Sequence, residues 1–313
     1  MLGKTAGGLY WMYRYMERSE NTSRLIEAGF RIALTRAATS DDEWSSVLEA
    51  AGVREAYLAR HDQFEQSAAI DFMLRDKSNP SSVLNTIEAA RNNARLVRTA
   101  LSRDVWEATN DLYLQVKAAL ARPVRDRDLP EVLNLIRQQN ALVRGSTHGT
   151  MLRNDIFNFA RVGTFLERAD STARILDVKY YVLLPSISQI GSALDNVQWE
   201  NILRSVGAQS SFRWLYGTDV NAMGIAEFLI LDRRMPRSLT FCASKAAGNL
   251  AYLEKEYGTR HPCHDQADAL VGRLSATTID EVFDNGLHEF VLDFLSDTSK
   301  LGASIETDYR FNG

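Results

Sequence analysis

The chain has 313 residues, of which 45% are hydrophobic and 24% charged, and its formal net charge is −4. This composition is typical of a globular protein with a sizeable core, and the acidic balance argues against a nucleic-acid-binding protein, which usually carries a basic face. We therefore expect no nucleic-acid partner. No apolar run approaches the roughly 20 residues that a membrane helix needs, so we also expect no membrane span. The chain has two cysteines and begins with no signal-peptide pattern, which predicts a cytoplasmic location.

Helical periodicity covers nearly the whole chain, and strand-like alternation is absent. Near the N-terminus, apolar residues recur at three- and four-residue spacing from Leu9 to Met16. Turn residues mark later helix boundaries at 77–81, where Pro80 opens a helix, and at 122–126. A second long helix is expected around 162–169, and Thr278 opens the last helical region. The sequence predicts an all-α protein of roughly ten to twelve helices of ordinary length.

The second half of the sequence repeats the first. The phrase MERSENTSRLI at 16–26 is matched by LERADSTARIL at 166–176, so Glu17-Arg18 corresponds to Glu167-Arg168. Two more blocks follow in the same order, in which Trp44, Leu48, Gly52, Phe72, Pro80, Ser82 and Asn93 correspond to Trp199, Leu203, Gly207, Phe228, Pro236, Ser238 and Asn249. Collinear matches predict an internal duplication. Because no flexible linker separates the halves, we expect a single helical domain with pseudo-two-fold symmetry and repeats of about 1–150 and 151–313.

The repeated phrase places charged side chains beside large apolar ones on two central helices. Steps of three and four residues return to one helical face, so these charges are expected to be partly buried, and buried charges must be paired. Two interpretations stay open: the Glu-Arg pairs fix the helix packing, or they line a polar cleft for a carboxylate, phosphate or peptide. The candidate ligand-binding residues are Arg14, Glu17, Arg18, Asn21, Arg24, Glu167, Arg168 and Arg174, with Arg237 and Ser238 at a predicted helix start that favours anions.

Signatures of metal or cofactor chemistry are weak. His261, Cys263 and His264 form the one group of metal-type ligands, but they do not make a complete zinc set, so we expect no metal. The sequence contains no P-loop, Rossmann fingerprint or serine-hydrolase elbow, and we expect no cofactor.

Four segments together carry a family resemblance. They are LYWMYRYMERSENTSRLIEA at 9–28, RNNARLVRTALSRDVWEATNDLY at 91–113, NDIFNFARVGTFLERADSTARILDVKYY at 154–181 and FLILDRRMPRSLTFC at 228–242. The chain resembles the alpha-E family, a helical domain named for its recurring Glu-Arg motif, over essentially all of 1–313. One departure is visible, because the family commonly has an arginine where this chain has Thr164, the counterpart of Arg14.

The resemblance implies a functional context. Alpha-E members typically accompany, or are fused to, circularly permuted ATP-grasp proteins, which usually activate a carboxylate as an acyl phosphate and join it to an amine. It therefore implies a component of a system that forms amide bonds or modifies peptides, with the ATP-grasp protein as partner and an anionic or peptide ligand in an Arg/Glu-lined cleft. The alternatives are a catalytic transferase or ligase subunit without metal, and a non-catalytic helical adaptor.

Overall fold

The structure is a computed structural model that describes residues 1–35, 40–183, 193–217 and 221–312, and this part of the chain contains helices and no strand, as predicted. The helices of the first half are α1 (Gly3–Thr35), α2 (Ser40–Ala50), α3 (Arg54–Leu58), α4 (Gln66–Leu74), α5 (Val83–Leu96), the 3-10 turn η1 (Arg98–Ala100), α6 (Arg103–Ala119) and α7 (Leu129–Thr150). Those of the second half are α8 (Asp155–Leu183), α9 (Ala193–Ser205), α10 (Gln209–Tyr216), α11 (Ala222–Ile230), α12 (Leu239–Tyr257), α13 (Pro262–Ala276), α14 (Ile279–Asp284) and α15 (Leu287–Asp308).

The prediction of ten to twelve helices was too low for the described part of the chain. Several helices are very short: α3 has 5 residues, α14 has 6 and α10 has 8. Segments of this length complete at most about two turns, so they carry too few apolar positions to produce a helical period in the sequence.

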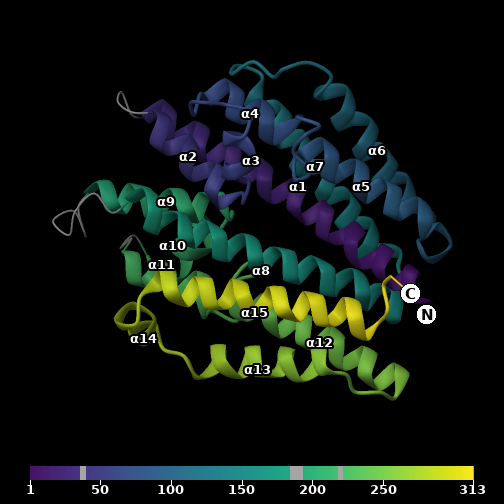
Figure 1. Ribbon diagram of the computed structural model, residues 1–313. Helices are drawn as coiled ribbons and strands as arrows, with labels where there is room; N and C mark the ends of the chain where they lie inside the picture. The colour runs from purple at the N-terminus through teal and green to yellow at the C-terminus, as the bar shows by residue number, and fades with distance from the viewer. Residues whose placement is uncertain (36–39, 184–192, 218–220, 313) are drawn as a thin grey trace.

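The two longest helices, α1 and α8, lie side by side at the centre and run in the same direction (Figure 1). Near their starts the backbones touch, because a Cβ added to Gly163 would lie 2.3 Å from the carbonyl oxygen of Tyr10. Further along both helices, Glu17 contacts Arg168. Glycine at 163 therefore permits the close approach that brings the two Glu-Arg dipeptides together.

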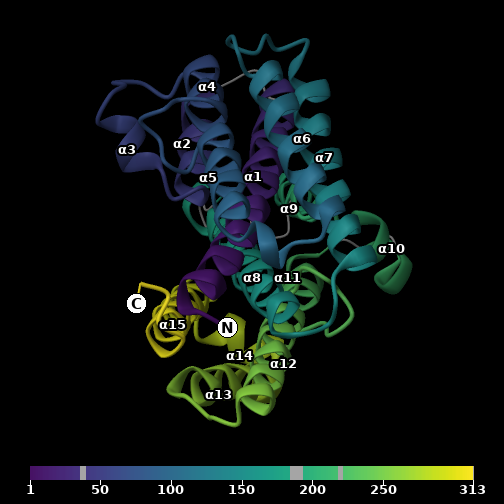
Figure 2. The ribbon, with the colours of Figure 1, turned by 90° about the vertical axis from the view of Figure 1, so that its right-hand side faces the viewer.

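The remaining helices cover the central pair from opposite sides. Helices α2–α7 lie around α1 in the upper part of the molecule, and α12–α15 lie below α8 (Figure 1 and Figure 2). Helices α5 and α7 pack on α1, whereas α12 and α15 pack on α8. Two helices cross over, since α2 also contacts α8 and α9 contacts α1. The buried apolar side chains of both halves form one continuous core.

Several helices of the first and second halves of the chain have similar lengths, caps and spacings of buried residues. Helices α7 and α15 have 22 residues each, and α4 and α11 have 9 each. Ser82 caps α5 and Ser238 caps α12, each accepting a hydrogen bond from a backbone N–H three residues later. The buried residues of α7 are Leu129, Leu133, Ile136, Asn140, Val143 and Thr147, and those of α15 are Val291, Phe294, Thr298, Leu301, Gly302 and Ile305. Within the described segments, none of the helices has the length and apolar character to cross a membrane.

Candidate functional site

The two Glu-Arg dipeptides exchange partners across the α1–α8 contact. Arg168 of α8 donates from Nε and Nη2 to the two carboxylate oxygens of Glu17 on α1, each over 2.9 Å. In the opposite sense, Arg18 of α1 donates from Nε and Nη2 to the carboxylate of Glu167 on α8, with Nη2 at 3.0 Å from Oε2. Each bond pair is bidentate, which fixes both the separation and the register of the two helices.

Burial and charge act in opposite directions on these carboxyl groups. The Glu17 side chain is 3% exposed and that of Glu167 is 5% exposed. Burial alone would raise the pKa of Glu17, but the charges of Arg168 and Arg237 outweigh it and hold the pKa below its usual value. For Glu167, the charges of Arg14 and Arg18 likewise outweigh burial and lower the pKa. Both groups therefore carry their negative charge inside the protein.

The second arginine at each glutamate comes from a different place. Arg14, one turn before Arg18, donates from Nε to Glu167 over 2.7 Å. Its counterpart Thr164 cannot donate such a bond to Glu17, and its hydroxyl instead donates to the carbonyl of Ala160. Arg237, just before α12, takes over this role, with Nη1 at 3.0 Å from Glu17 Oε1. Arg237, from the segment that precedes α12, thus supplies the second arginine at Glu17 that Thr164 does not.

Arg237 also joins a neighbouring cluster around Glu20. The carboxylate of Glu20 accepts from Arg24 and Arg144 over 2.8 Å each and from Arg237 over 2.9 Å. Arg237 donates further to Asn21 Oδ1 over 2.8 Å. Desolvation lowers the pKa of Arg237 to about 10, since two carboxylates only partly offset its burial and the repulsion from Arg168 and Arg24. Around Glu17 and Glu20, the arginines that contact the two carboxylates therefore carry more positive charge than the carboxylates carry negative charge.

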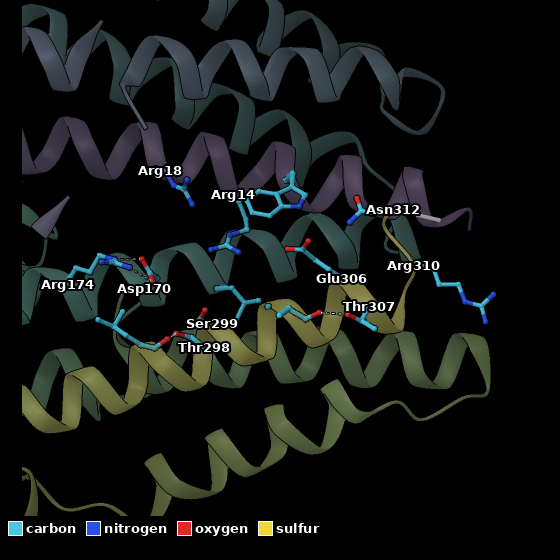
Figure 3. A pocket seen from close by; sticks show the side chains of 15 residues that line it. Arg14, Arg18, Asp170, Arg174, Thr298, Ser299, Glu306, Thr307, Arg310 and Asn312 are labelled. Carbon is cyan, nitrogen blue, oxygen red and sulfur yellow. Dashed lines mark hydrogen bonds and ion pairs between the residues drawn. The ribbon is translucent and has the colours of Figure 1, made fainter. Parts of the chain in front are cut away.

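A cleft of about 820 Å³ lies between α1, α8 and α15 (Figure 3). Arg14, Arg18 and Arg174 line it beside Asp170, and Glu306 of α15 faces it from the opposite wall. Burial raises the pKa of Glu306 while the charge of Arg14 opposes the shift. Figure 3 places Arg310 at the end near the C-terminus, pointing away from the other arginines. The volume falls within the range of about 300–1,000 Å³ of small-molecule sites.

The structure divides the predicted site residues into three groups. Arg14, Arg18 and Arg174 reach the cleft. Arg168, Arg237 and Ser238 are buried elsewhere, and the Ser238 hydroxyl is engaged as the cap of α12. A third group lies around smaller pockets: Asn21 and Glu167 line one of about 200 Å³ beside Arg18, and Arg24 lines one of about 320 Å³ beside Gly207.

Sequence reasoning missed the residues that α15 and α8 bring to the cleft. In the repeated phrase Asp170 stands at the position of Glu20, but the phrase alone does not indicate that Asp170 lies on a cleft wall. Ser299, Gly302 and Glu306 lie on α15, which carries no copy of the Glu-Arg phrase. Spacing of four residues between Gly302 and Glu306 could have placed these two on one face, but not beside α1.

The His261–His264 segment is accounted for by local structure. His264 Nδ1 accepts a hydrogen bond from the backbone N–H of His261 over 2.9 Å, which caps α13. Both cysteines are buried, and burial raises the pKa of the Cys242 thiol to about 12. Among the residues that the structure describes, no group of three or more His, Cys, Asp or Glu is placed to hold a metal ion.

Comparisons with known proteins fit this architecture. The chain is 22% identical over 310 residues to an uncharacterized protein of Mycobacterium bovis and, to the same extent, to uncharacterized proteins of two Mycobacterium tuberculosis strains. These alignments cover 92% of this chain but 34% of each relative, so the chain spans about a third of their length. No solved structure matches the chain. Residues 1–309 match the family Alpha-E, described as "a predicted alpha-helical domain with a conserved ER motif". The chain, with its two Glu-Arg dipeptides at the central helix contact, belongs to the alpha-E family.

Proposed function

We propose that residues 1–313 form one domain that arose by duplication, with repeats of about 1–150 and 151–313 related by pseudo-two-fold symmetry. The exchange of Glu-Arg partners supports this proposal. So does a second exchange: Arg24 of α1 lies against Gly207, and Arg174 of α8 lies against Gly52. Gly52 and Gly207 adopt nearly the same left-handed backbone, with φ of 67° and 69°.

The cleft between α1, α8 and α15 is the proposed binding site for an anionic or peptide ligand. The observation that carries this proposal is the cleft itself, where arginines held in place by Glu167 and Asp170 still expose part of their side chains. The exposed fractions are 17% for Arg14, 28% for Arg18 and 40% for Arg174. Guanidinium groups fixed in this way are preorganised to bind a carboxylate, phosphate or peptide carbonyl.

The proposed context is a cytoplasmic system in which a circularly permuted ATP-grasp protein forms amide bonds or modifies peptides. The chain would hold the carboxylate or peptide substrate for that partner. Family membership supports the association, and the cleft supplies a place for the substrate. In a mixture of the purified chain and that ATP-grasp protein, we expect co-elution at micromolar concentrations. Separate elution would count against this context but not against ligand binding.

Ligand binding is tested by closing the cleft. Ser299 lies on the cleft wall, whereas Ser296 is exposed on the same helix outside it. Succinate and trialanine serve as anionic and peptide probes in isothermal titration calorimetry. We expect Ser299→Trp to remove binding and Ser296→Trp to preserve it, with both variants unfolding at the wild-type temperature. Absence of binding to the wild type, or equal binding by both variants, would overturn the proposal.

A catalytic role is the second candidate, because Glu306 faces the same cleft and its pKa is raised. A carboxyl group that faces a cleft and has a raised pKa is a candidate general acid or base. In a reconstituted reaction with the ATP-grasp protein, Glu306→Gln should lower the rate of product formation by at least about a hundredfold, the usual contribution of a general acid or base. Glu289→Gln, at the start of the same helix and outside the cleft, is the control. An unchanged rate in Glu306→Gln would exclude this candidate.

A further inference from the structure

The two sides of the central helix pair differ in one respect that bears on the ligand. Where α7 meets α1, a cavity of about 30 Å³ remains, lined by Glu17, Arg144 and Thr164 among others. Where α15 meets α8, the cleft measures about 820 Å³. The duplication proposed above makes these two places equivalent. A side chain must therefore occupy the space between α7 and α1 that has no counterpart between α15 and α8.

The filling group is the side chain of Arg144. The buried faces of α7 and α15 superpose when Val143 is matched with Leu301, and this alignment pairs Arg144 with Gly302. Arg144 extends to Glu20 and donates from Nη1 to Oε2 over 2.8 Å. On the other side, a Cβ at Gly302 would lie 3.3 Å from the hydroxyl of Tyr10 and 3.6 Å from Nη1 of Arg14, so a longer side chain here would extend into the cleft. Glycine at this position keeps the cleft open.

A second arginine is replaced as well. The match of Pro80 with Pro236 and of Ser82 with Ser238 pairs Ser81 with Arg237. Arg237 donates to Glu20 over 2.9 Å, whereas Ser81 is short and borders a pocket of about 200 Å³. Asp170, Arg18 and Arg174 line both this pocket and the large cleft, so the two spaces meet at Asp170.

Asp170 is consequently left with spare acceptor capacity. Its counterpart Glu20 accepts from three arginines. Within the described residues, Asp170 accepts only from Arg174, over 2.8 and 3.4 Å, and its side chain is 25% exposed. An ionised carboxylate has about four acceptor sites, two of which remain for a ligand. Asn21 lines the same small pocket, and its buried Nδ2 lacks a partner in the described structure.

We propose that Asp170 binds a cationic group of the ligand, a guanidinium or alkylammonium, in the place that the chain's own arginines occupy around Glu20. The ligand thus carries a positive group at the junction of the two pockets and its anionic or peptide portion along Arg14 and Arg18. Asn21 Nδ2 is placed to donate to a ligand carbonyl in the small pocket. This assignment rests on the cleft being the binding site, as proposed above.

Matched probes test the assignment. N-acetyl-argininamide carries a guanidinium, N-acetyl-citrullinamide carries an uncharged group of the same shape, and N-acetyl-lysinamide carries an ammonium. By calorimetry, the wild type should bind at least one cationic probe about tenfold or more tightly than the citrulline probe, as expected for a charge-assisted hydrogen bond. Asp170→Asn should reduce that ratio to near one while succinate binding persists. Asp293→Asn, at an exposed position of α15, should keep the wild-type ratio.

A second variant copies the other half of the chain. Ser81→Arg should place a guanidinium beside Asp170 and abolish binding of the cationic probes, whereas Ser81→Gln should retain it. Unchanged preference for the cationic probes in both Asp170→Asn and Ser81→Arg overturns the assignment, as does the absence of any preference in the wild type. Either result with succinate or trialanine still bound leaves the cleft as the binding site, whereas loss of all binding to the wild type removes the proposed function itself.

Discussion

Arg168 donates two hydrogen bonds of 2.9 Å to Glu17, and Arg18 donates in the opposite sense to Glu167 at the same helix contact. These four side chains join α1 to α8 at a contact that shields both carboxylates from water. A buried ion pair adds little to the free energy of unfolding, because the cost of removing both charges from water offsets much of their attraction. Its main effect is to specify how the two helices pack. Removing one member of the pair nevertheless leaves the charge of the other member buried without a partner.

Removing one carboxylate should therefore destabilise the protein strongly. Glu17→Gln leaves Arg168 and Arg237 without their shared partner, and Glu167→Gln does the same to Arg14 and Arg18. We expect each to lower the free energy of unfolding by about 3–5 kcal/mol, measured by urea denaturation. Glu107→Gln, which removes an exposed ion pair with Arg103, should leave the midpoint unchanged. A midpoint unaffected by either buried substitution would show that the exchanged pairs do not hold the helices together.

The left-handed glycines provide a test of the equivalence of the two halves. Gly52→Ala and Gly207→Ala each place a Cβ at positive φ and within 3.3 and 3.1 Å of Arg174 and Arg24, respectively. Both should lose about 1–2 kcal/mol of stability. Gly145→Ala, in α7 with no atom near the new Cβ, should gain about 0.5–1 kcal/mol. A loss at only one of the two positions would contradict their equivalence.

The buried carboxylates should make the protein sensitive to acid. Glu17, Glu20 and Glu167 have pKa values lowered in the folded chain from the ordinary 4.5. Their contribution to stability is complete above about pH 4.5 and is lost as the pH falls from there toward the folded pKa values. Urea midpoints measured between pH 7 and pH 3 should fall steeply below about pH 4.5, and the fall should be shallower in Glu167→Gln. Glu306, whose pKa is raised, works in the opposite direction.

The cysteines should be inert in the native protein. Cys242 and Cys263 are buried, and burial raises the pKa of both thiols, to about 12 for Cys242. A thiol-specific reagent at pH 8 should label neither in the folded state and both in urea. Rapid labelling of the folded chain would reveal an accessible thiolate at odds with this packing.

The sequence by itself determined the helical class and the long helices that carry the Glu-Arg dipeptides, because helical period is a local property of the chain. It also predicted that the charges on these helices are paired, because they stand beside large apolar residues. It also identified the family through motifs spread along 1–313. It could not assign partners: that Glu17 pairs with Arg168 rather than with Arg24 on its own helix follows from the parallel contact of α1 and α8, which Gly163 permits.

The cleft was decided by tertiary structure alone. Its wall is α15, which joins α1 and α8 from more than a hundred residues away in sequence, and its openness depends on the absence of a side chain at Gly302. A position without a side chain leaves no periodic signal. Under the proposed duplication, Asp170 keeps acceptor sites because Ser81 and Gly302 correspond to Arg237 and Arg144, which both donate to Glu20. Contacts of this kind depend on which side chains of different helices meet in space, and the sequence of one helix does not specify them.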